Sequence, residues 1–238
     1  LMKVLSGEYT DYSGELILNG EKVSFKGIKE SEAAGIAIIH QELGLIQTLT
    51  VCENIFLGDE VCQSGLIDWD FEYDRAKELL DELKLKVNPK TRVGNLGIGQ
   101  QQLVEIAKAL NKNCKILILD EPTAGLDPAG CRGVLENIAA YRRETGSAVL
   151  LVTHSMDDAA RIADRLIVFH AGHVAFDGAP AEVFAHTQEL LDIGLDVPQS
   201  ARIAQALRDR GIPLPPSIYT LEQLTDALLA AGKEAGVC

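Results

Sequence analysis

Two adjacent carboxylates follow a short apolar run near the middle of the chain. Residues 115–119 (KILIL) lead into Asp120 and Glu121, and Pro122 then ends the strand pattern. A run this short and this apolar predicts a strand buried on both faces of a parallel sheet. Its polar end lies at the carboxyl edge of the sheet, where α/β folds bind ligands. There Asp120 can hold Mg²⁺ and Glu121 can orient or deprotonate an attacking water. A core strand followed by an acidic turn is the simpler alternative.

Further polar features stand at the ends of other predicted elements. Gln41 follows a strand pattern over 34–40, His154 follows another over 148–153, and Asp127 ends a loop after the carboxylate pair. A glycine-containing turn opens a helical pattern and consists of Leu96, Gly97, Ile98, Gly99 and Gln100. Taken singly, Gln41 would be a surface glutamine and His154 an ordinary strand-end histidine. Their shared position at element ends favours one site, because loops at the sheet edge carry function.

The composition narrows the classes of function. The formal charge of −13 disfavours a protein that binds the phosphate backbone of nucleic acid. Aromatic residues make up only 5% of the chain, which argues against stacking platforms for single strands. Five cysteines without CxxC spacing indicate reduced thiols rather than a disulfide framework or a zinc site: Cys52, Cys62, Cys114, Cys131 and Cys238. No apolar run reaches transmembrane length, so we expect any membrane role to depend on a partner.

The elements that must position these residues form an α/β core interrupted by helices. We expect residues 1–44 and 109–190 to form the core, because they contain the apolar strand patterns. Residues 45–108 show helical spacing and predict a helical subdomain that includes the glycine-containing turn. Residues 191–238 predict a helical appendage, since prolines there separate short amphipathic helices.

The order and spacing of the motifs resemble the ATP-binding cassette (ABC) ATPases. Gln41 matches the Q-loop of that family, Leu96–Gln100 the signature motif and Asp120-Glu121 the Walker B motif. Ala124–Asp127 matches the D-loop and His154 the switch histidine. The resemblance covers nearly the whole chain, and the combination is far more specific than any single motif. It implies a P-loop NTPase α/β fold with a parallel sheet, a helical subdomain and a C-terminal helical appendage.

The resemblance also implies a role for each residue, with ATP and Mg²⁺ as cofactors. Asp120 would support the metal, Glu121 would orient the nucleophilic water, and His154 would contact the γ-phosphate. Gln41 would reach both the metal and the water and would sense the membrane partner. The signature residues would bring backbone N–H groups and a helix N-terminus towards phosphate on a second cassette, and Asp127 would link the two sites.

The implied partners are transmembrane permease subunits and a second ATP-binding cassette, identical or different, without nucleic acid. The implied location is the cytoplasmic face of the membrane, through the permease.

Two departures from the family pattern stand out. The signature reads LGIGQ where the family usually has LSGGQ, so the serine hydroxyl is missing and Ile98 replaces a glycine. These 238 residues also contain no GxxxxGK[ST]. Residues 1–7 resemble the helix that follows the phosphate loop, so we expect a fragment that begins after the Walker A lysine. The phosphate-loop strand would then be absent. From this we expect negligible ATPase activity alone, a poorly filled sheet position and low solubility.

The two halves of the chain resemble different branches of the family. Residues 1 to about 123 resemble the first cassette of xylose- and ribose-type sugar importers, notably in TRVGNLGIGQQQLVEIAKALNKN. From Gly125 onwards the chain resembles the ATPase of energy-coupling-factor importers for vitamins and cobalt, including Leu195–Gln199 and RGIPLP. A natural fusion and an assembly artefact both remain open, and so does the transported substrate.

Three functional hypotheses follow. The favoured one is the ATP-binding and ATP-hydrolysing subunit of an ABC-type membrane importer. A soluble ABC ATPase that does not transport is disfavoured, because the chain has no coiled-coil arm, zinc insert or basic linker. A non-catalytic cassette that completes a partner's ATP site is disfavoured by the presence of Asp120, Glu121 and His154.

Overall fold

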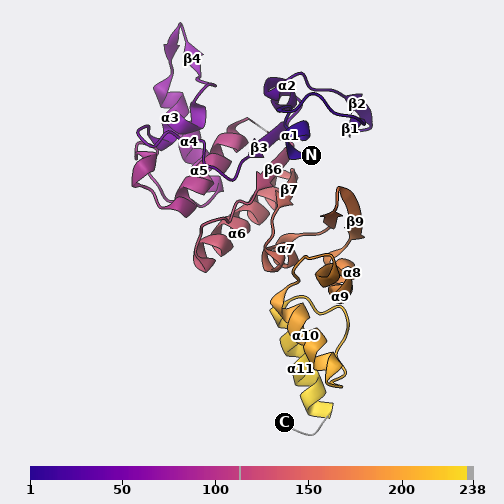
Figure 1. The fold of residues 1–238 in the computed structure, drawn as a ribbon. Helices are drawn as coiled ribbons and strands as arrows, with labels where there is room; N and C mark the ends of the chain where they lie inside the picture. Colours follow the sequence, from indigo (N-terminus) through magenta and orange to yellow (C-terminus); the bar gives the residue numbers. More distant parts are fainter. Residues whose placement is uncertain (113, 235–238) are drawn as a thin grey trace. The chain divides into compact units, whose positions relative to one another are not determined.

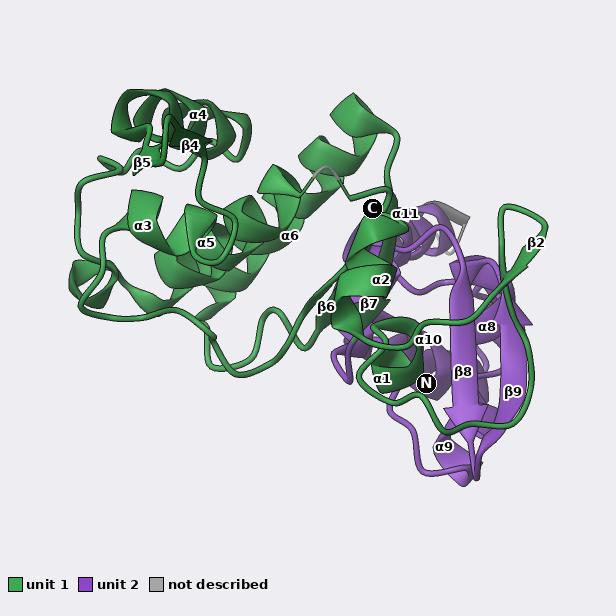
Figure 2. Ribbon diagram, turned by 90° about the horizontal axis from the view of Figure 1, so that it is seen from above, with its two compact units in different colours: residues 1–152 green, residues 153–238 purple. Residues whose placement is uncertain are grey.

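The computed structural model describes residues 1–112 and 114–234. It divides the chain into two compact units, Leu1–Val152 and Thr153–Cys238, which are coloured separately in Figure 2. Cys238 lies outside the described residues. The boundary falls within the segment 109–190 that the sequence assigns to the core. Two strands of that segment, β8 (Leu166–His170) and β9 (His173–Gly178), pair with each other to form a separate two-stranded sheet.

The first unit contains a parallel sheet, two antiparallel ribbons and six α-helices among its described residues. In chain order its elements are α1 (Met2–Leu5), β1 (Leu16–Leu18), β2 (Glu21–Val23), α2 (Ile28–Ala33), β3 (Ile36–Ile39), α3 (Val51–Phe56), β4 (Cys62–Gln63), β5 (Leu66–Ile67), α4 (Trp69–Glu82), the 3₁₀ helix η1 (Val93–Asn95), α5 (Ile98–Asn111), β6 (Ile116–Asp120), α6 (Pro128–Thr145) and β7 (Ala148–Val152).

The three parallel strands lie in the order β3-β6-β7 (Figure 1). Side chains alternate between the two faces of this sheet, as strand geometry requires. Leu117 and Leu119 belong to the large core cluster that includes residues of α5 and α6. Ile36 and Ile118 belong instead to a smaller cluster with Phe25, against which residues of α1 pack. Because both faces of the sheet are covered, the apolar runs of β3 and β6 are explained.

Strand β7 is the edge strand of this sheet among the described residues, since it pairs only with β6. All five of its side chains are apolar, yet none is fully buried. By contrast, the three central residues of β6 are buried. The expected parallel sheet is confirmed, and β7 gives it an apolar edge.

Helices α3, α4 and α5 pack on one another in Figure 1 and form most of the large core. Thr50 caps α3 through a reciprocal capping box with Glu53. The side chain of Asn54 is completely buried and hydrogen-bonds both the N–H and the carbonyl oxygen of Ile46. These bonds fix the chain that leads from β3 into the helices.

The second unit combines a hairpin with short helices. Its elements are α7 (Met156–Ile162), β8 (Leu166–His170), β9 (His173–Gly178), α8 (Pro180–Ala185), α9 (Thr187–Asp192), α10 (Gln199–Asp209) and α11 (Leu221–Glu234). The hairpin turns at Ala171 and Gly172, both with positive φ, as a two-residue hairpin turn requires. Among the described residues, no helix is both long and apolar enough to cross a membrane.

Candidate functional site

Asp120 and Gln41 lie at the same edge of the parallel sheet. Asp120 is the last residue of β6, and Ile39, the last residue of β3, pairs in register with Leu119. Gln41 therefore follows β3 at the edge where Asp120 ends β6. Val152, the last residue of β7, pairs with Asp120. The structure thus brings the predicted carboxylate and the predicted glutamine to one sheet edge.

Glu121 has an unusual backbone conformation. Its φ is +48°, in the left-handed region that residues other than glycine rarely adopt. Its N–H donates to the carbonyl oxygen of Val152 at 2.9 Å, and its own carbonyl oxygen accepts from the N–H of Ala124 at 3.0 Å. The residue is only 8% exposed. Such strain persists where the surroundings hold it in place, and it is concentrated at functional sites.

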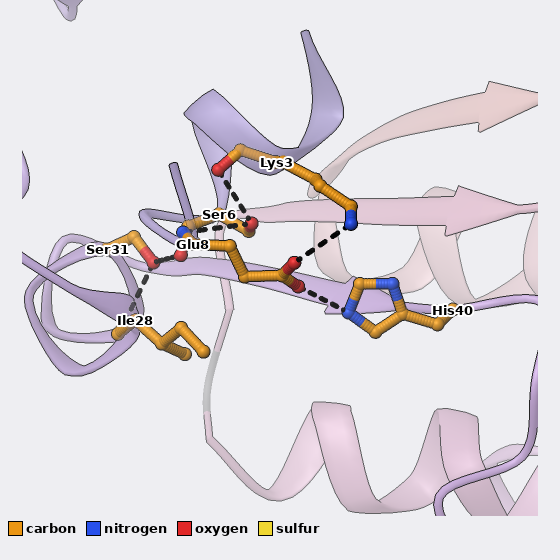
Figure 3. Close-up of polar contacts among 6 residues, drawn as sticks. All are labelled: Lys3, Ser6, Glu8, Ile28, Ser31 and His40. Atoms are coloured by element: carbon orange, nitrogen blue, oxygen red, sulfur yellow. Dashed lines mark hydrogen bonds and ion pairs between the residues drawn. The ribbon is translucent and has the colours of Figure 1, made fainter. Parts of the chain in front are cut away.

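His40, immediately before Gln41, is held by a carboxylate from the N-terminal segment. Its Nε2 atom lies 2.8 Å from Glu8 Oε1, and Lys3 Nζ lies 3.9 Å from the other oxygen of Glu8 (Figure 3). The N–H of Glu8 is in turn bonded to the hydroxyl of Ser6. These contacts tie the end of β3 to the segment after α1. The sequence reasoning missed Glu8, because no motif links it to the sheet edge.

The signature residues form the start of α5. Leu96 follows η1, and Gly97 is the N-cap residue in an extended conformation. The Oε1 atom of Gln100 accepts a hydrogen bond from the N–H of Gly97 at 3.2 Å. Ile98 is 55% exposed. The turn therefore places an apolar side chain and the first N–H groups of a 14-residue helix at the surface.

Asp127 has a local structural role in this chain. Its Oδ1 atom accepts a hydrogen bond from the N–H of Gly130 at 2.8 Å, which makes Asp127 the N-cap residue of α6. Pro128 occupies the first helical position, where its missing N–H has no cost. The link to a second cassette that the resemblance implies remains a prediction.

Glu105 of α5 reaches the chain just after Gln41. A Cβ atom added at Gly44 would lie 3.4 Å from Glu105 Oε1. Burial raises the pKa of the Glu105 carboxyl group, while the charge of Lys108 opposes the shift. Oε1 is one of two buried side-chain polar atoms without a hydrogen-bond partner in the described part of the chain; the other is Gln102 Nε2. A single glutamate among the apolar residues of LVEIAKAL is the signal that could have pointed to it.

His154 belongs to the second unit, whereas the other predicted site residues belong to the first. It lines an open cavity of about 300 Å³ with residues of α7 and α10 and of the chain before α10. At the edge of this cavity Asp157 Oδ1 accepts the N–H of Gln199 at 3.2 Å. Arg202 and Asp196, which also line it, form an ion pair at 2.6 Å. The cavity is therefore polar, and its charged side chains have partners.

A protein-family model described as "ABC transporter" matches residues 1–124. The chain is 49% identical over 174 residues to the xylose import ATP-binding protein XylG of Moorella thermoacetica. It is 45% identical over 174 residues to the L-arabinose transport ATP-binding protein AraG of Geobacillus stearothermophilus. Each match covers 72% of this chain and 34% of the relative. The chain thus spans about a third of the length of these relatives, and the likeness continues beyond residue 123.

Solved structures of ATP-binding cassettes share the fold. The structure of cbiO1 from Clostridium perfringens, part of the ABC transporter complex cbiONQ, matches with a TM-score of 0.69 and 26% identity. That match covers 87% of this chain and 81% of the other. A dimeric ATP-binding cassette bound to ADP and Pi in a post-hydrolysis state matches with a TM-score of 0.62 and 25% identity. It covers 75% of this chain and 78% of that one.

Proposed function

This chain belongs to the ABC transporter family, and we propose that it is part of the ATP-hydrolysing subunit of a membrane importer for a pentose sugar. The carrying observation is the shared sheet edge, where Asp120, strained Glu121 and Gln41 follow neighbouring strands. The names of the relatives, a xylose import and an L-arabinose transport protein, support a pentose as cargo.

The residues at the sheet edge suit the hydrolysis of a phosphoanhydride. The carboxylate of Asp120 and the amide oxygen of Gln41 are the hard oxygen donors that Mg²⁺ prefers. These two residues would hold Mg²⁺, which would supply positive charge to neutralise the phosphoryl oxygens. Glu121 would orient the attacking water and accept its proton.

The start of α5 suits an anion held by a second polypeptide. Its exposed first turn presents backbone N–H groups and the positive end of the helix dipole. We infer that this turn closes on the nucleotide of a second cassette, and that permease subunits place the assembly at the cytoplasmic face of the membrane. If its carboxylates serve one nucleotide and its helix N-terminus another, the chain would act only with such a partner.

The decisive experiment mixes this chain with a cassette that carries GxxxxGK[ST] and measures the binding of a fluorescent ATP analogue in Mg²⁺. We expect the chain to tighten binding, and Gly99→Asp to abolish the tightening, because the new carboxylate repels phosphate. The fold tolerates a side chain at Gly99, since a Cβ atom there would lie 3.7 Å from Leu126 in ordinary contact. An acidic residue in the first helical turn also stabilises the helix.

Gly133→Asp is the matched control. Gly133 is another glycine within a helix, and a Cβ atom there would meet nothing within 4 Å. This variant should tighten nucleotide binding as the unchanged chain does. If the folded chain has no effect on binding, or if both aspartate variants behave alike, the proposed function is wrong.

A further inference from the structure

The side chain of Gln101 joins the signature turn, Leu96–Gln100, to the segment that follows Gln41. The Nε2 atom of Gln101 donates to the carbonyl oxygen of Leu96 at 2.9 Å. Its Oε1 atom accepts from Nε2 of Gln47 at 3.1 Å. The side-chain amide of Gln101 therefore holds residue 96 with its donor and residue 47 with its acceptor, and each bond uses the proper end of the group.

The backbone brings the same two segments together. The N–H of Gly94 donates to the carbonyl oxygen of Gln47, and the N–H of Val93 to that of Leu49, both at 3.0 Å. A Cβ atom at Gly94 would lie only 3.0 Å from that same Gln47 oxygen, so a larger residue would push the segments apart. Residues 41–49, here called the Gln41 segment, thus run directly against the chain that enters the signature turn.

Glu105 makes a second approach from α5, near the start of the Gln41 segment. Its Oε1 atom faces Gly44, three residues after Gln41. Helix α5 therefore lies close to the Gln41 segment at Gly44 and is hydrogen-bonded to it at Gln47. A displacement of either segment must break or carry along the side chain of Gln101.

We propose that Gln101 is a positioning residue that couples the Gln41 segment to the signature turn through Gln47. The functional meaning of this coupling rests on the proposed function, in which Gln41 serves one nucleotide and the signature turn serves another. Gln101 touches neither nucleotide in that scheme. It makes the two segments move together. A change in the position of Gln41 at one ATP site therefore shifts the signature turn, which serves the other ATP site.

Hydrogen exchange resolved to short peptides tests the coupling in the full 238-residue chain. Because one neutral hydrogen bond contributes about 1 kcal/mol, Gln47→Ala should speed exchange of the amides in 96–100 on the order of fivefold. Gln101→Ala should do the same in the Gln41 segment. The double variant should add little to Gln101→Ala, since that variant already removes the hydrogen bond to Gln47.

The variant Gln101→Glu distinguishes loss of the hydrogen-bonded connection through Gln101 from a general loss of structure. A glutamate keeps an oxygen that accepts from Gln47, but it cannot donate to the carbonyl oxygen of Leu96. Exchange should therefore stay slow in the Gln41 segment and become fast in 96–100. A residue with only a general structural role would affect both segments alike.

Gln205→Ala is the matched control, because Gln205 also donates one side-chain hydrogen bond, to Asp209, and accepts one, from Arg208. It should leave exchange in both segments unchanged. The proposal is overturned if Gln47→Ala leaves 96–100 unchanged or if the two single variants act additively. No nucleotide is present in this measurement, so its failure is distinct from a failure of the ATP-binding test.

Discussion

The N–H of Glu121 donates to the carbonyl oxygen of Val152 at 2.9 Å from a left-handed backbone conformation. The bond continues the pairing of β6 with β7 by one residue beyond Asp120. It therefore fixes the carboxylate immediately after the sheet edge, at the cost of a φ that a Cβ atom disfavours.

Substitutions at Glu121 should reveal that backbone strain. Glu121→Gly should be more stable than Glu121→Ala by about 1 kcal/mol, because only glycine adopts positive φ without cost. At Glu136, an exposed residue inside α6, the order should reverse by about 1 kcal/mol, since glycine weakens a helix interior. Urea unfolding of the four variants measures both differences, and the same order at both positions would contradict the assignment of strain.

The pH dependence of stability should separate two glutamates. Burial raises the pKa of Glu105, so the stability linked to this group is present at low pH and is lost as pH rises through the raised value. Glu105→Gln should therefore remove part of the fall in unfolding free energy that occurs as pH rises above the ordinary carboxyl pKa. If the unfolding free energy of the variant changes with pH as steeply as that of the parent chain, ionisation of Glu105 does not destabilise the fold.

The contribution of Glu53 to stability should depend on pH in the opposite direction to that of Glu105. The backbone N–H and then the hydroxyl of Thr50 lower the pKa of its carboxyl group. Its contribution is present above the ordinary carboxyl pKa and is lost as pH falls through the lowered value. Glu53→Gln should thus cost stability near neutral pH and little in acid, in the same urea measurements.

The cysteines should differ sharply in reactivity. Burial, with Glu72 and Glu53 nearby, raises the pKa of Cys52 to about 11, so about one thiol in a thousand is ionised at pH 8. Burial also raises the pKa of Cys114, whereas Cys62 is exposed on β4. We expect iodoacetamide to modify Cys62 at least about a hundredfold faster than Cys52. Peptide mapping by mass spectrometry measures the rates, which should converge in denaturant.

Substitution of Asp127 should change the stability of the isolated chain, because Asp127 caps α6. Asp127→Ala removes the cap of α6 and should lower the unfolding free energy by about 1 kcal/mol. Asp127→Asn keeps a side-chain oxygen for the N–H of Gly130 and should cost less. Thermal unfolding of the isolated chain ranks the two variants, and equal losses would show that the hydrogen bond to Gly130 contributes nothing.

The 238 residues alone should hydrolyse ATP at a negligible rate, because they contain carboxylates but no GxxxxGK[ST] to cradle the phosphates. Phosphate release by the purified chain measures this. Robust turnover that disappears in Glu121→Gln would refute the prediction, while turnover that persists in Glu121→Gln would indicate a contaminant.

The sheet-edge residues were predictable because their signals are local. An apolar run followed by Asp120 and Glu121 specifies both the strand and the place of its polar end. The same reasoning places Gln41 after β3. The turn between β1 and β2 also has a local signal, since an Asn-Gly pair accepts the positive φ that Asn19 and Gly20 both adopt.

The relay through Gln101 could not be read from the sequence. Gln47 and Gln101 lie 54 positions apart, and amide side chains carry no periodic signal. Glu8 meets His40 only because the segment after α1 passes the end of β3.

Because the first turn of α5 is exposed, the measured stability of this chain should depend on the anion in the buffer. Gly97, the N-cap residue, has no side-chain oxygen to accept hydrogen bonds from the first N–H groups of α5. These N–H groups can therefore bind dissolved anions. An anion that binds only the folded chain stabilises it by RT ln(1 + [L]/Kd). Melting temperatures measured in phosphate and in chloride at equal ionic strength are therefore different quantities, and comparisons among variants of the signature turn require one fixed anion.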